Sequence, residues 1–457
     1  MPLQKNQVLT LQVERLSSDG SGVAHSPEGE TVFIPGAAPG DEARVRIVKD
    51  CKRYAFGILD EVLTPSPDRI PVDCAVAGPC GGCSLRHLDY AAELRAKQEN
   101  VADAFARIGG LDVPVLPIVG SPEIDRYRNK VQFPVGTDKV GRPCIGFYAG
   151  RTHRIVPCPD CRLQPGVLNE IGNTLCAFFA EKGIHPYNEE TGKGLVRHIF
   201  LRRGAHSGQI MVCLVSTRAK IPSADELCTR LKEAFPDIVT ILLNVNAKNT
   251  NVILGSETHT LYGQGYIEDT LCGVPVQLGP LSFYQVNTLA AEQLYGIAAE
   301  YAQLTPDDLL LDLYCGMGTI GLSMADHCRE LVGVEIVPEA IESAKANAAR
   351  MGAAVSAKSR FFCADAGQAA AQLAAEGLHP DVVMLDPPRK GCDEATLSAV
   401  VRMAPRRVVY VSCNPATAAR DAAWLEQNGY HAEKVQPVDL FPRTKHCECV
   451  IAMSKSK

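Results

Sequence analysis

Residues 309–321 read Leu309-Leu310-Leu311-Asp312-Leu313-Tyr314-Cys315-Gly316-Met317-Gly318-Thr319-Ile320-Gly321. This segment predicts a buried strand that runs directly into glycines at a helix start, a turn that lets a ligand approach bare backbone. Gly316, Gly318 and Gly321 have the spacing of the dinucleotide-binding fingerprint. Glu335 ends the next predicted strand about 20 residues on, where it could accept hydrogen bonds from ribose hydroxyls. NAD binding and a purely structural tight turn are both compatible with this pattern.

The C-terminal part of the chain alternates between predicted helices and strands. Apolar runs from about residue 280 predict these elements at 287–304, 309–313, 320–324, 331–335, 338–350, 360–363, 382–385 and 408–412. Such alternation predicts a parallel, doubly wound sheet of the Rossmann-like α/β class. Ligands of these sheets bind beyond the carboxyl ends of the strands.

The rest of the chain predicts two further parts, because 457 residues suffice for roughly three domains. A small β-barrel is predicted for residues 1–62, which hold short strand-like runs separated by turns such as 18–22 and 35–40; the runs lie at 8–13, 31–34, 43–49 and 56–62. The barrel could bind RNA or be an inert structural unit. Helical spacing between Leu88 and Gly110 predicts one amphipathic helix. Further on, an α+β domain built largely on antiparallel pairs is predicted from the runs 196–201, 209–216, 239–246 and 251–254.

Composition limits the classes of protein to consider. The chain is 46% hydrophobic and 21% charged, which is ordinary for a globular protein. Its 18 cysteines are too few for a disulfide scaffold, and the first twenty residues lack the apolar core of a signal peptide, so we expect a reducing, cytoplasmic location. No apolar run is long enough to predict a membrane span. The net charge of −6 means that any nucleic-acid surface must be local.

Three polar residues follow other predicted strands and should reach the same sheet edge as the glycine turn. Asp386 begins the string Asp-Pro-Pro-Arg, for which a hydride-transfer enzyme has no evident use. Asp365 could accept a bond from an adenine amino group, or simply cap the next helix. Together with the glycine turn, these positions resemble the S-adenosylmethionine (SAM) site of class I methyltransferases. Cys413 ends a buried strand, so its sulfur could point into the same crevice, although buried cysteines are usually apolar fillers.

A thiol at this edge has a specific chemical use. Carbon 5 of uracil is a poor nucleophile until a group adds at carbon 6, and a thiolate can make that addition. After methyl transfer, a base must remove the carbon-5 proton so that the sulfur can leave. Glu448 is one candidate base and His446 is the competing one, although spacing alone would make Glu448 a solvated surface acid.

Five segments of the chain are similar to the bacterial RNA uracil-C5 methyltransferases, namely Ser282-Phe283-Tyr284-Gln285-Val286-Asn287, Asp312–Gly318, Leu385-Asp386-Pro387-Pro388-Arg389, Ser412-Cys413-Asn414-Pro415 and His446-Cys447-Glu448. The resemblance covers nearly the whole chain and implies that Cys413 is the nucleophile and Glu448 the base. It implies a SAM and uracil site made of Gln285, Asp312, Tyr314, Gly316, Gly318, Glu335, Asp365 and Asp386. The N-terminal strands then resemble the TRAM barrel, an RNA-binding module.

The resemblance also implies a discontinuous catalytic domain. Its expected boundaries are 1–62 for the TRAM-like, OB-like barrel, 63–87 with 111–278 for a central iron–sulfur and RNA-binding domain, and 88–110 with 279–457 for the class I methyltransferase domain. The helix of residues 88–110 would therefore pack on the C-terminal sheet despite its early position. No membrane and no obligate protein partner are expected.

Cysteines in two loops suggest a metal. On spacing alone, thiolates at Cys74, Cys80, Cys83 and a later cysteine could hold tetrahedral zinc or an iron–sulfur cluster, with a slight preference for zinc. The resemblance reverses that preference, because this pattern is similar to the family's [4Fe–4S] site, and Arg162-Leu163-Gln164 makes Cys161 a better fourth match than Cys158. The chain has no cysteine triplet of the radical-SAM type, so a closed cluster with a structural or RNA-positioning role is expected.

Structured RNA is the expected partner. Locally basic strings occur at 126–130, 151–154 and 202–203, and the first of these interleaves arginine with tyrosine. Family members with both a TRAM-like barrel and a cluster loop mostly act on 23S ribosomal RNA, which makes that RNA the preferred substrate and tRNA the alternative. Two other hypotheses are methylation of an exocyclic amine, which would need Asn-Pro-Pro-aromatic at residue 386, and a non-catalytic RNA-binding iron–sulfur protein.

Overall fold

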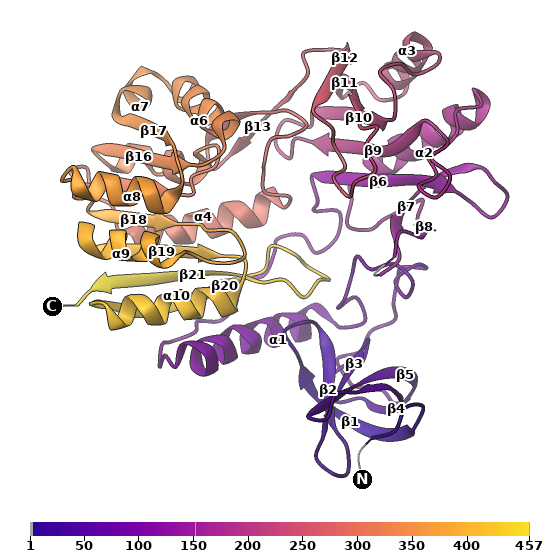
Figure 1. Ribbon diagram of the computed structural model, residues 1–457, viewed down its shortest axis with the longest axis horizontal. Helices are drawn as coiled ribbons and strands as arrows, with labels where there is room; N and C mark the ends of the chain where they lie inside the picture. The colour runs from indigo at the N-terminus through magenta and orange to yellow at the C-terminus, as the bar shows by residue number, and fades with distance from the viewer. Residues whose placement is uncertain (1–2, 151, 457) are drawn as a thin grey trace.

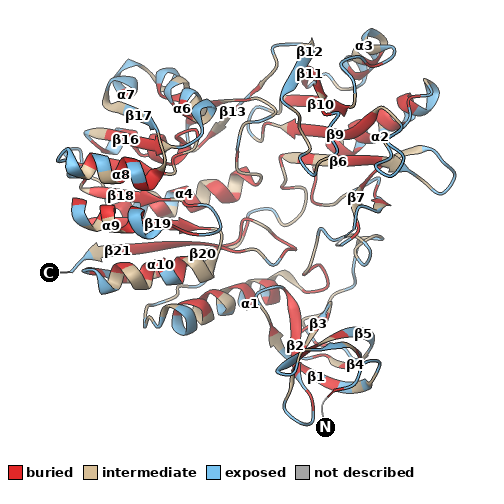
Figure 2. Cartoon of the chain, in the orientation of Figure 1, coloured by how far each residue is buried: buried red, intermediate tan, exposed pale blue. Residues whose placement is uncertain are grey.

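The computed structural model describes residues 3–150 and 152–456, and it shows a barrel, a central sheet and a C-terminal sheet in that order along the chain (Figure 1). Each part has buried apolar residues of its own. Figure 2 shows these buried residues along the middle strands of both large sheets. The predicted multidomain α/β class is confirmed. Within the described residues, no helix is long and apolar enough to cross a membrane, and Arg151 of one predicted basic string lies outside these residues.

Five strands close the N-terminal barrel in the order β1-β2-β3-β5-β4. They are β1 (Val8–Leu16), β2 (Ser21–His25), β3 (Thr31–Pro35), β4 (Glu42–Asp50) and β5 (Tyr54–Thr64). The predicted turn at 18–22 ends earlier than expected, because Ser21 and Gly22 already belong to β2. A Cβ at Gly22 would lie 2.9 Å from both Ala37 and Val13, so glycine lets this strand approach the barrel interior.

The predicted helix before the central domain consists of α1 (Tyr90–Asp103) and a π-helical turn, η1 (Ala104–Gly109). Asp89 caps its start by accepting a hydrogen bond from the Ala92 N–H at 2.9 Å. Val101 and Phe105 are buried in the apolar core of the C-terminal sheet, against α10 (Pro415–Gln427). This early segment therefore packs on the last part of the chain.

The central sheet has the order β12-β11-β10-β9-β6-β7-β8. Its strands are β6 (Lys130–Thr137), β7 (Pro143–Tyr148), β8 (Ile155–Pro157), β9 (Val196–Arg203), β10 (Ile210–Ser216), β11 (Ile238–Val245) and β12 (Glu257–Tyr262). Helices α2 (Gly166–Glu181) and α3 (Ala224–Ala234) contribute apolar side chains to its core. A hairpin of β13 (Ile267–Leu271) and β14 (Val274–Leu278) leads to the C-terminal domain.

One prediction for this sheet needs correction. Residues 251–254 form no strand, because the Asn246 side-chain amide donates to the Val252 and Ile253 carbonyls at 2.6 and 3.0 Å and holds a loop. The edge strand is β12 instead. The prediction of largely antiparallel pairs is confirmed; β10 and β11 are parallel, because α3 carries the chain from one to the other, and the other pairs in this sheet are antiparallel.

The C-terminal sheet has the order β17-β16-β15-β18-β19-β21-β20. Its strands are β15 (Leu309–Leu313), β16 (Glu330–Glu335), β17 (Ser359–Cys363), β18 (Val382–Leu385), β19 (Arg407–Ser412), β20 (Tyr430–Val438) and β21 (Glu448–Lys455). The first five strands in this order are parallel, and β21 is antiparallel to both β19 and β20. Chain order reverses between β15 and β18, which opens a ligand crevice at their carboxyl ends.

The remaining helices belong to this domain and lie along its sheet (Figure 1). They are α4 (Thr288–Ala302), α5 (Thr319–Ser323), the 3₁₀ turn η2 (Ala325–His327), α6 (Pro338–Met351), α7 (Ala353–Lys358), α8 (Ala366–Ala375) and α9 (Glu394–Met403). The predicted helices and parallel strands therefore occur, with bounds shifted by a few residues at most. The antiparallel pair β20 and β21 completes the sheet beyond the predicted strands.

A buried ammonium group joins α1 to the loop between β20 and β21. Lys97 is 1% exposed, and its Nζ donates to Glu93 Oε1 at 2.7 Å, to Asp439 Oδ1 at 2.8 Å and to the Phe441 carbonyl at 3.2 Å. Glu93 also accepts from the Arg443 backbone N–H at 2.8 Å. Burial opposes the charge, but the two carboxylates raise the pKa of Lys97, which therefore stays protonated. The loop at 439–447 is thus fixed from the side of α1.

We predict that Lys97→Met lowers the free energy of unfolding by about 3–5 kcal/mol, because it leaves two buried carboxylates without their cation. Urea unfolding followed by circular dichroism measures this change. Lys345→Met is the matched control, since Lys345 pairs with Glu342 on the exposed face of α6 and should cost less than about 1 kcal/mol. Equal effects of the two substitutions would contradict the stabilising role of Lys97.

Candidate active site and cysteine pocket

The predicted glycine turn lies between β15 and α5 at the carboxyl edge of the C-terminal sheet. Gly316 and Gly318 have φ values of +55° and +80°, which favour glycine. A Cβ at Gly318 would lie 3.1 and 3.2 Å from Leu322 and Ala344. Tyr314 also has a left-handed φ of +66°, an uncommon conformation for a bulky residue. The turn therefore presents bare backbone to the crevice.

Two carboxylates hold this turn in place. Asp312 Oδ2 accepts from the Gly321 N–H at 2.9 Å, and Glu335 Oε2 accepts from the Gly316 N–H at 3.2 Å. Burial raises the pKa of Asp312 to about 8, and the charges of Asp386 and Glu335 add to the rise. Asp312 is 1% exposed and braces the turn from within, whereas Glu335 ends β16 at the crevice. A direct cofactor contact by either residue stays a prediction.

Asp365 caps α8, as one of its two interpretations predicted. Its Oδ1 accepts from the Gly367 and Gln368 N–H groups at 3.1 and 3.2 Å.

Sequence reasoning missed the apolar surface near this edge: Ile336 and Val337, directly after Glu335, are 62% and 45% exposed. Large apolar residues at the end of a buried parallel strand are the signal that could have identified this surface.

Gln285 and Asp386 come together around a buried tyrosine. The Tyr295 hydroxyl, on α4, interacts with the side chains of Gln285 and Thr319. Burial raises the pKa of Tyr295, and the nearby charge of Asp386 raises it further. Burial also raises the pKa of Asp386 itself to about 7. Tyr295 thus connects three segments that are far apart in sequence, and sequence reasoning did not identify it.

Cys413 and Glu448 face each other across two neighbouring strands. The register of β19 and β21 pairs Ser412 with Cys449, so Cys413 and Glu448 follow as the next positions at the sheet edge. Glu448 is buried rather than a solvated surface acid. Burial raises its pKa to about 8, the charge of Asp386 adds to the rise, and Arg389 opposes it.

The Cys413 thiol titrates in the same electrostatic environment. Burial raises its pKa, as do the charges of Glu448 and Asp386, while the neighbouring Arg389 guanidinium opposes this rise. Arg389 is thus the nearby cation that favours the thiolate, a role that its sequence string did not reveal. Burial and four surrounding cations, Arg389 first among them, lower the pKa of His446 to about 4. His446 is therefore neutral near pH 7, with little tendency to take up a proton.

A pocket of about 450 Å³ opens beside Cys413 and reaches the N-terminal barrel. Arg15 and Ser18 come from the barrel side, and α1 and η1 form another wall. Arg15 also forms an ion pair with Asp103 at the end of α1, which joins the barrel to this wall. The pocket is rich in basic side chains, with Arg15, Lys97, Arg107, Arg389 and Lys445 all among its lining residues.

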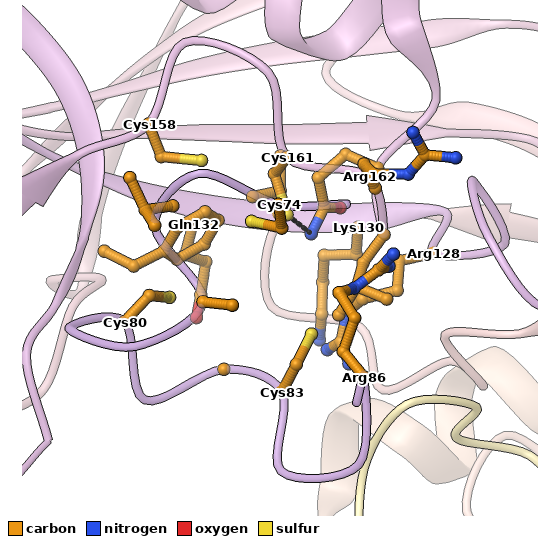
Figure 3. A pocket seen from close by; sticks show the side chains of 17 residues that line it. Cys74, Cys80, Cys83, Arg86, Arg128, Lys130, Gln132, Cys158, Cys161 and Arg162 are labelled. Carbon is orange, nitrogen blue, oxygen red and sulfur yellow. Dashed lines mark hydrogen bonds between the residues drawn. The ribbon is translucent and has the colours of Figure 1, made fainter. Parts of the chain in front are cut away.

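A second pocket, of about 300 Å³, gathers five cysteines from the two predicted loops (Figure 3). Its thiols are those of Cys74, Cys80, Cys83, Cys158 and Cys161. The Cys158 thiol hydrogen-bonds to Cys161 and lowers the pKa of Cys161, while the same interaction raises the pKa of Cys158. Burial raises the pKa of Cys83 to about 11.

The thiols of this pocket could hold a metal group. Among the described residues, no three His, Cys, Asp or Glu side chains converge closely enough to hold a single ion. The five cysteines line one pocket, and thiolates are ligands of both zinc and iron–sulfur clusters. The choice between these two groups therefore stays a prediction.

Comparisons with known proteins agree with this geometry. The family model described as tRNA (Uracil-5-)-methyltransferase matches residues 276–456, and the TRAM domain model matches residues 2–59. An uncharacterized RNA methyltransferase of Halalkalibacterium halodurans is 43% identical over 453 residues, which are 99% of this chain and 98% of that protein. One from Clostridium tetani is 41% identical over 454 residues, with the same shares.

A solved structure is similar over nearly the whole chain. It is the tRNA (uracil-54, C5)-methyltransferase of Pyrococcus abyssi in complex with S-adenosyl-L-homocysteine, with a TM-score of 0.76 and 27% identity over 98% of this chain and 100% of that one. The fold and the glycine turn thus define a SAM-dependent methyltransferase joined to an RNA-binding TRAM domain. The chain belongs to the RNA uracil-C5 methyltransferase family. This sets aside the hypotheses of an NAD enzyme, an exocyclic-amine methyltransferase and a non-catalytic protein.

Proposed function

We propose that the protein methylates carbon 5 of a uracil in 23S rRNA through a transient bond between Cys413 Sγ and carbon 6 of the ring. The observation that carries this proposal is the cross-strand placement of Cys413 and Glu448 at the crevice of a methyltransferase sheet. The pocket beside Cys413 has room for a nucleotide flipped out of its RNA helix, and Arg107, Arg389 and Lys445 in its lining suit the flanking phosphates.

Cys413 begins the reaction as a thiolate. Its sulfur adds to carbon 6, and the electron pair of the carbon 5–carbon 6 double bond moves into an enolate, which makes carbon 5 nucleophilic. Bound SAM would supply the electrophilic methyl group that carbon 5 attacks, and S-adenosylhomocysteine would leave as the sulfur–methyl bond breaks. The Glu448 carboxylate then takes the proton from carbon 5, the double bond forms again, and the bond between carbon 6 and sulfur breaks to release the thiolate.

The other predicted site residues have roles that follow from their positions. Arg389 stabilises the thiolate, and Asp386 lies beside Cys413 and Glu448, where it can hydrogen-bond to the polar edge of the uracil. The glycine turn and the ends of β16 and β17 hold SAM. We assign the SAM site to Gln285, Asp312, Tyr314, Gly316, Gly318, Glu335 and Asp365.

The choice of RNA rests on the domain combination. The chain joins a TRAM barrel to a cysteine pocket, and family members with both parts mostly act on 23S rRNA. A cytoplasmic location accords with such a substrate. The second candidate is tRNA, which is favoured by the likeness to the Pyrococcus abyssi tRNA enzyme over 98% of this chain.

We further infer that the cysteine pocket holds a [4Fe–4S] cluster, bound by Cys74, Cys80, Cys83 and Cys161. The Gln164 side-chain amide donates to Cys161 Sγ at 3.9 Å, which supports this choice of fourth ligand over Cys158, because such a donor stabilises the thiolate form that binds metal. The cluster loop is tied to the active-site loop, since the Ser84 and Leu85 N–H groups donate to the Arg443 carbonyl at 3.0 and 3.1 Å. The role of the group is therefore structural.

RNA substituted with 5-fluorouridine tests the covalent step, because fluorine at carbon 5 blocks the final elimination. We predict that the protein with SAM forms a stable protein–RNA adduct on fluorinated 23S rRNA, seen as a shifted band in a denaturing gel. Cys413→Ala should form none while it still binds RNA. Fluorinated tRNA is tested in parallel as the alternative substrate, and an adduct with tRNA alone would identify tRNA as the substrate. An adduct with the Cys413→Ala variant would show that Cys413 is not the nucleophile.

Glu448→Gln tests the base. This substitution should leave the first two steps intact and slow the decay of the natural RNA adduct by about 10²–10⁴-fold. In the wild type, decay should speed up as pH rises and level off above about 8, because the raised pKa of Glu448 keeps its carboxyl protonated below that pH. Quenching single-turnover reactions at a series of times measures both the rate of adduct decay and its pH dependence. A normal rate in Glu448→Gln would assign proton removal to another acceptor.

Matched cysteine variants test the cluster. Anaerobically purified protein should contain iron and sulfide and show a broad visible absorption band. Cys161→Ala should lose most of both, whereas Cys158→Ala should keep them. Zinc in place of iron, or loss of the cluster in Cys158→Ala but not in Cys161→Ala, would contradict the assignment.

A further inference from the structure

A pocket remote from Cys413 lies on the central sheet and takes no part in the reaction above. It encloses about 600 Å³, within the range of small-molecule sites, and is lined by residues of β6, β7 and β9 and of adjoining loops. We call it the Tyr148 pocket, and its main side chains are Tyr148, His153, Tyr187, Glu189, Arg197 and His198.

Planar side chains form the walls of the Tyr148 pocket. The rings of Tyr148 and His153 lie 5.3 Å apart with an angle of 31° between their planes. The Arg197 guanidinium lies over the Tyr187 ring, 4.9 Å from its centroid. Two flat surfaces of this kind are what nucleobases stack on, and such stacking tolerates any base.

A buried histidine adds an unused hydrogen-bonding group. His198 is 5% exposed, and its Nε2 lies 3.3 Å from the Tyr148 hydroxyl. Its Nδ1 has no hydrogen-bond partner among the described residues. Burial lowers the pKa of His198 to about 4, so the imidazole is neutral near pH 7. A neutral imidazole offers one donor and one acceptor, which suits an uncharged heterocycle.

The charges of the pocket also favour a base over a phosphate. Glu189 accepts from His153 Nδ1 at 2.6 Å and lies 4.0 Å from the Arg197 guanidinium. Arg197 itself is committed to backbone carbonyls, including that of Lys248 at 2.6 Å. The lining holds two acidic side chains, Glu189 and Glu190, and two basic ones, Arg154 and Arg197, so that their formal charges cancel. A phosphate would gain little from this balance.

Strand β6 runs from the cysteine pocket to the Tyr148 pocket. Lys130 and Gln132 of β6 line the cysteine pocket, and residues 135–137 of the same strand line the Tyr148 pocket. At about 3.3 Å per residue, the two ends of β6 lie roughly 20 Å apart. The pocket beside Cys413 is lined by the barrel, by α1 and η1 and by the C-terminal domain, so an RNA that fills both it and the Tyr148 pocket must extend onto the central sheet.

We propose that the Tyr148 pocket binds an unpaired base of the RNA substrate, remote from the uracil that is methylated. This inference rests on the proposed function, because it takes RNA as the substrate. The base stacks on Tyr148 and Tyr187 and hydrogen-bonds to His198. Its purpose is to select RNAs long enough to reach from Cys413 across the central sheet.

The test compares a long methyl-accepting RNA with the shortest hairpin that is still methylated. Tyr148→Ala should weaken binding of the long RNA roughly tenfold, measured by fluorescence anisotropy, and raise its KM by the same factor without changing kcat. Tyr148→Phe should keep most of the affinity, since the ring remains. The short hairpin should bind both variants as tightly as it binds the wild type.

Two further variants control for side effects. His153→Ala removes a side chain that is 58% exposed, so it tests the pocket without disturbing the core if Tyr148→Ala proves unstable. Tyr262→Ala removes an aromatic ring from the opposite edge strand, β12, and should leave affinity unchanged. Wild-type affinity for the long RNA in both Tyr148→Ala and His153→Ala would overturn the proposal. Anisotropy needs no methyl transfer, so this result is separable from a failure of the proposed chemistry.

Discussion

Lys97 keeps its ammonium group inside the protein, between Glu93 and Asp439, and this contact joins an N-terminal helix to the loop that ends at Glu448. A buried charge is costly unless it is fully paired, so the helix and the loop must adopt one relative position. Tyr90 strengthens the same junction by donating to Asp439 at 2.9 Å. The central sheet therefore lies in the chain between α1 and the C-terminal sheet on which α1 packs.

This junction positions the chemistry at the sheet edge. With the loop at 439–447 fixed, Glu448 begins β21 opposite the end of β19, where Cys413 lies. Burial then gives both groups raised pKa values, so that the thiol and the carboxyl are largely neutral until a substrate or a higher pH ionises them. Arg389 is the adjacent cation that offsets this cost for the thiolate. The barrel, through Arg15, forms one side of the pocket beside Cys413.

The elements that the sequence predicted best are those with strong local signals. The strand and glycines at 309–321 formed as expected, because apolar runs and left-handed glycines constrain the backbone wherever they occur. The strand expected at 251–254 was wrong, because a side chain outside it, Asn246, occupies its carbonyls. Strand β2 was not predicted, because Ser21 and Gly22 at its start are residue types typical of turns. Residue 22 must be glycine because residues distant in sequence fill the barrel interior beside it.

The site could be predicted only in part, because some of its residues come together through contacts between segments that are distant in sequence. Cys413 and Asp386 follow apolar strands, and parallel strands bring their carboxyl ends to one edge, whereas Glu448 begins the antiparallel strand β21. Tyr295 and the Tyr148 pocket depend on contacts between distant segments, which leave no periodic pattern, whereas Ile336 follows a predicted strand directly and could have been identified. The cysteines could be grouped by spacing, but the pairing of Cys158 with Cys161 required coordinates.

The most direct test of the covalent account is to locate the attached nucleotide by mass spectrometry. Glu448→Gln would be incubated with natural RNA and SAM, digested with protease and nuclease, and its peptides sequenced. The account predicts a methylated, saturated uridine on the peptide that contains Cys413, with its mass added at that sulfur. The same nucleotide on any other cysteine, or no attached nucleotide despite completed methyl transfer, would contradict it.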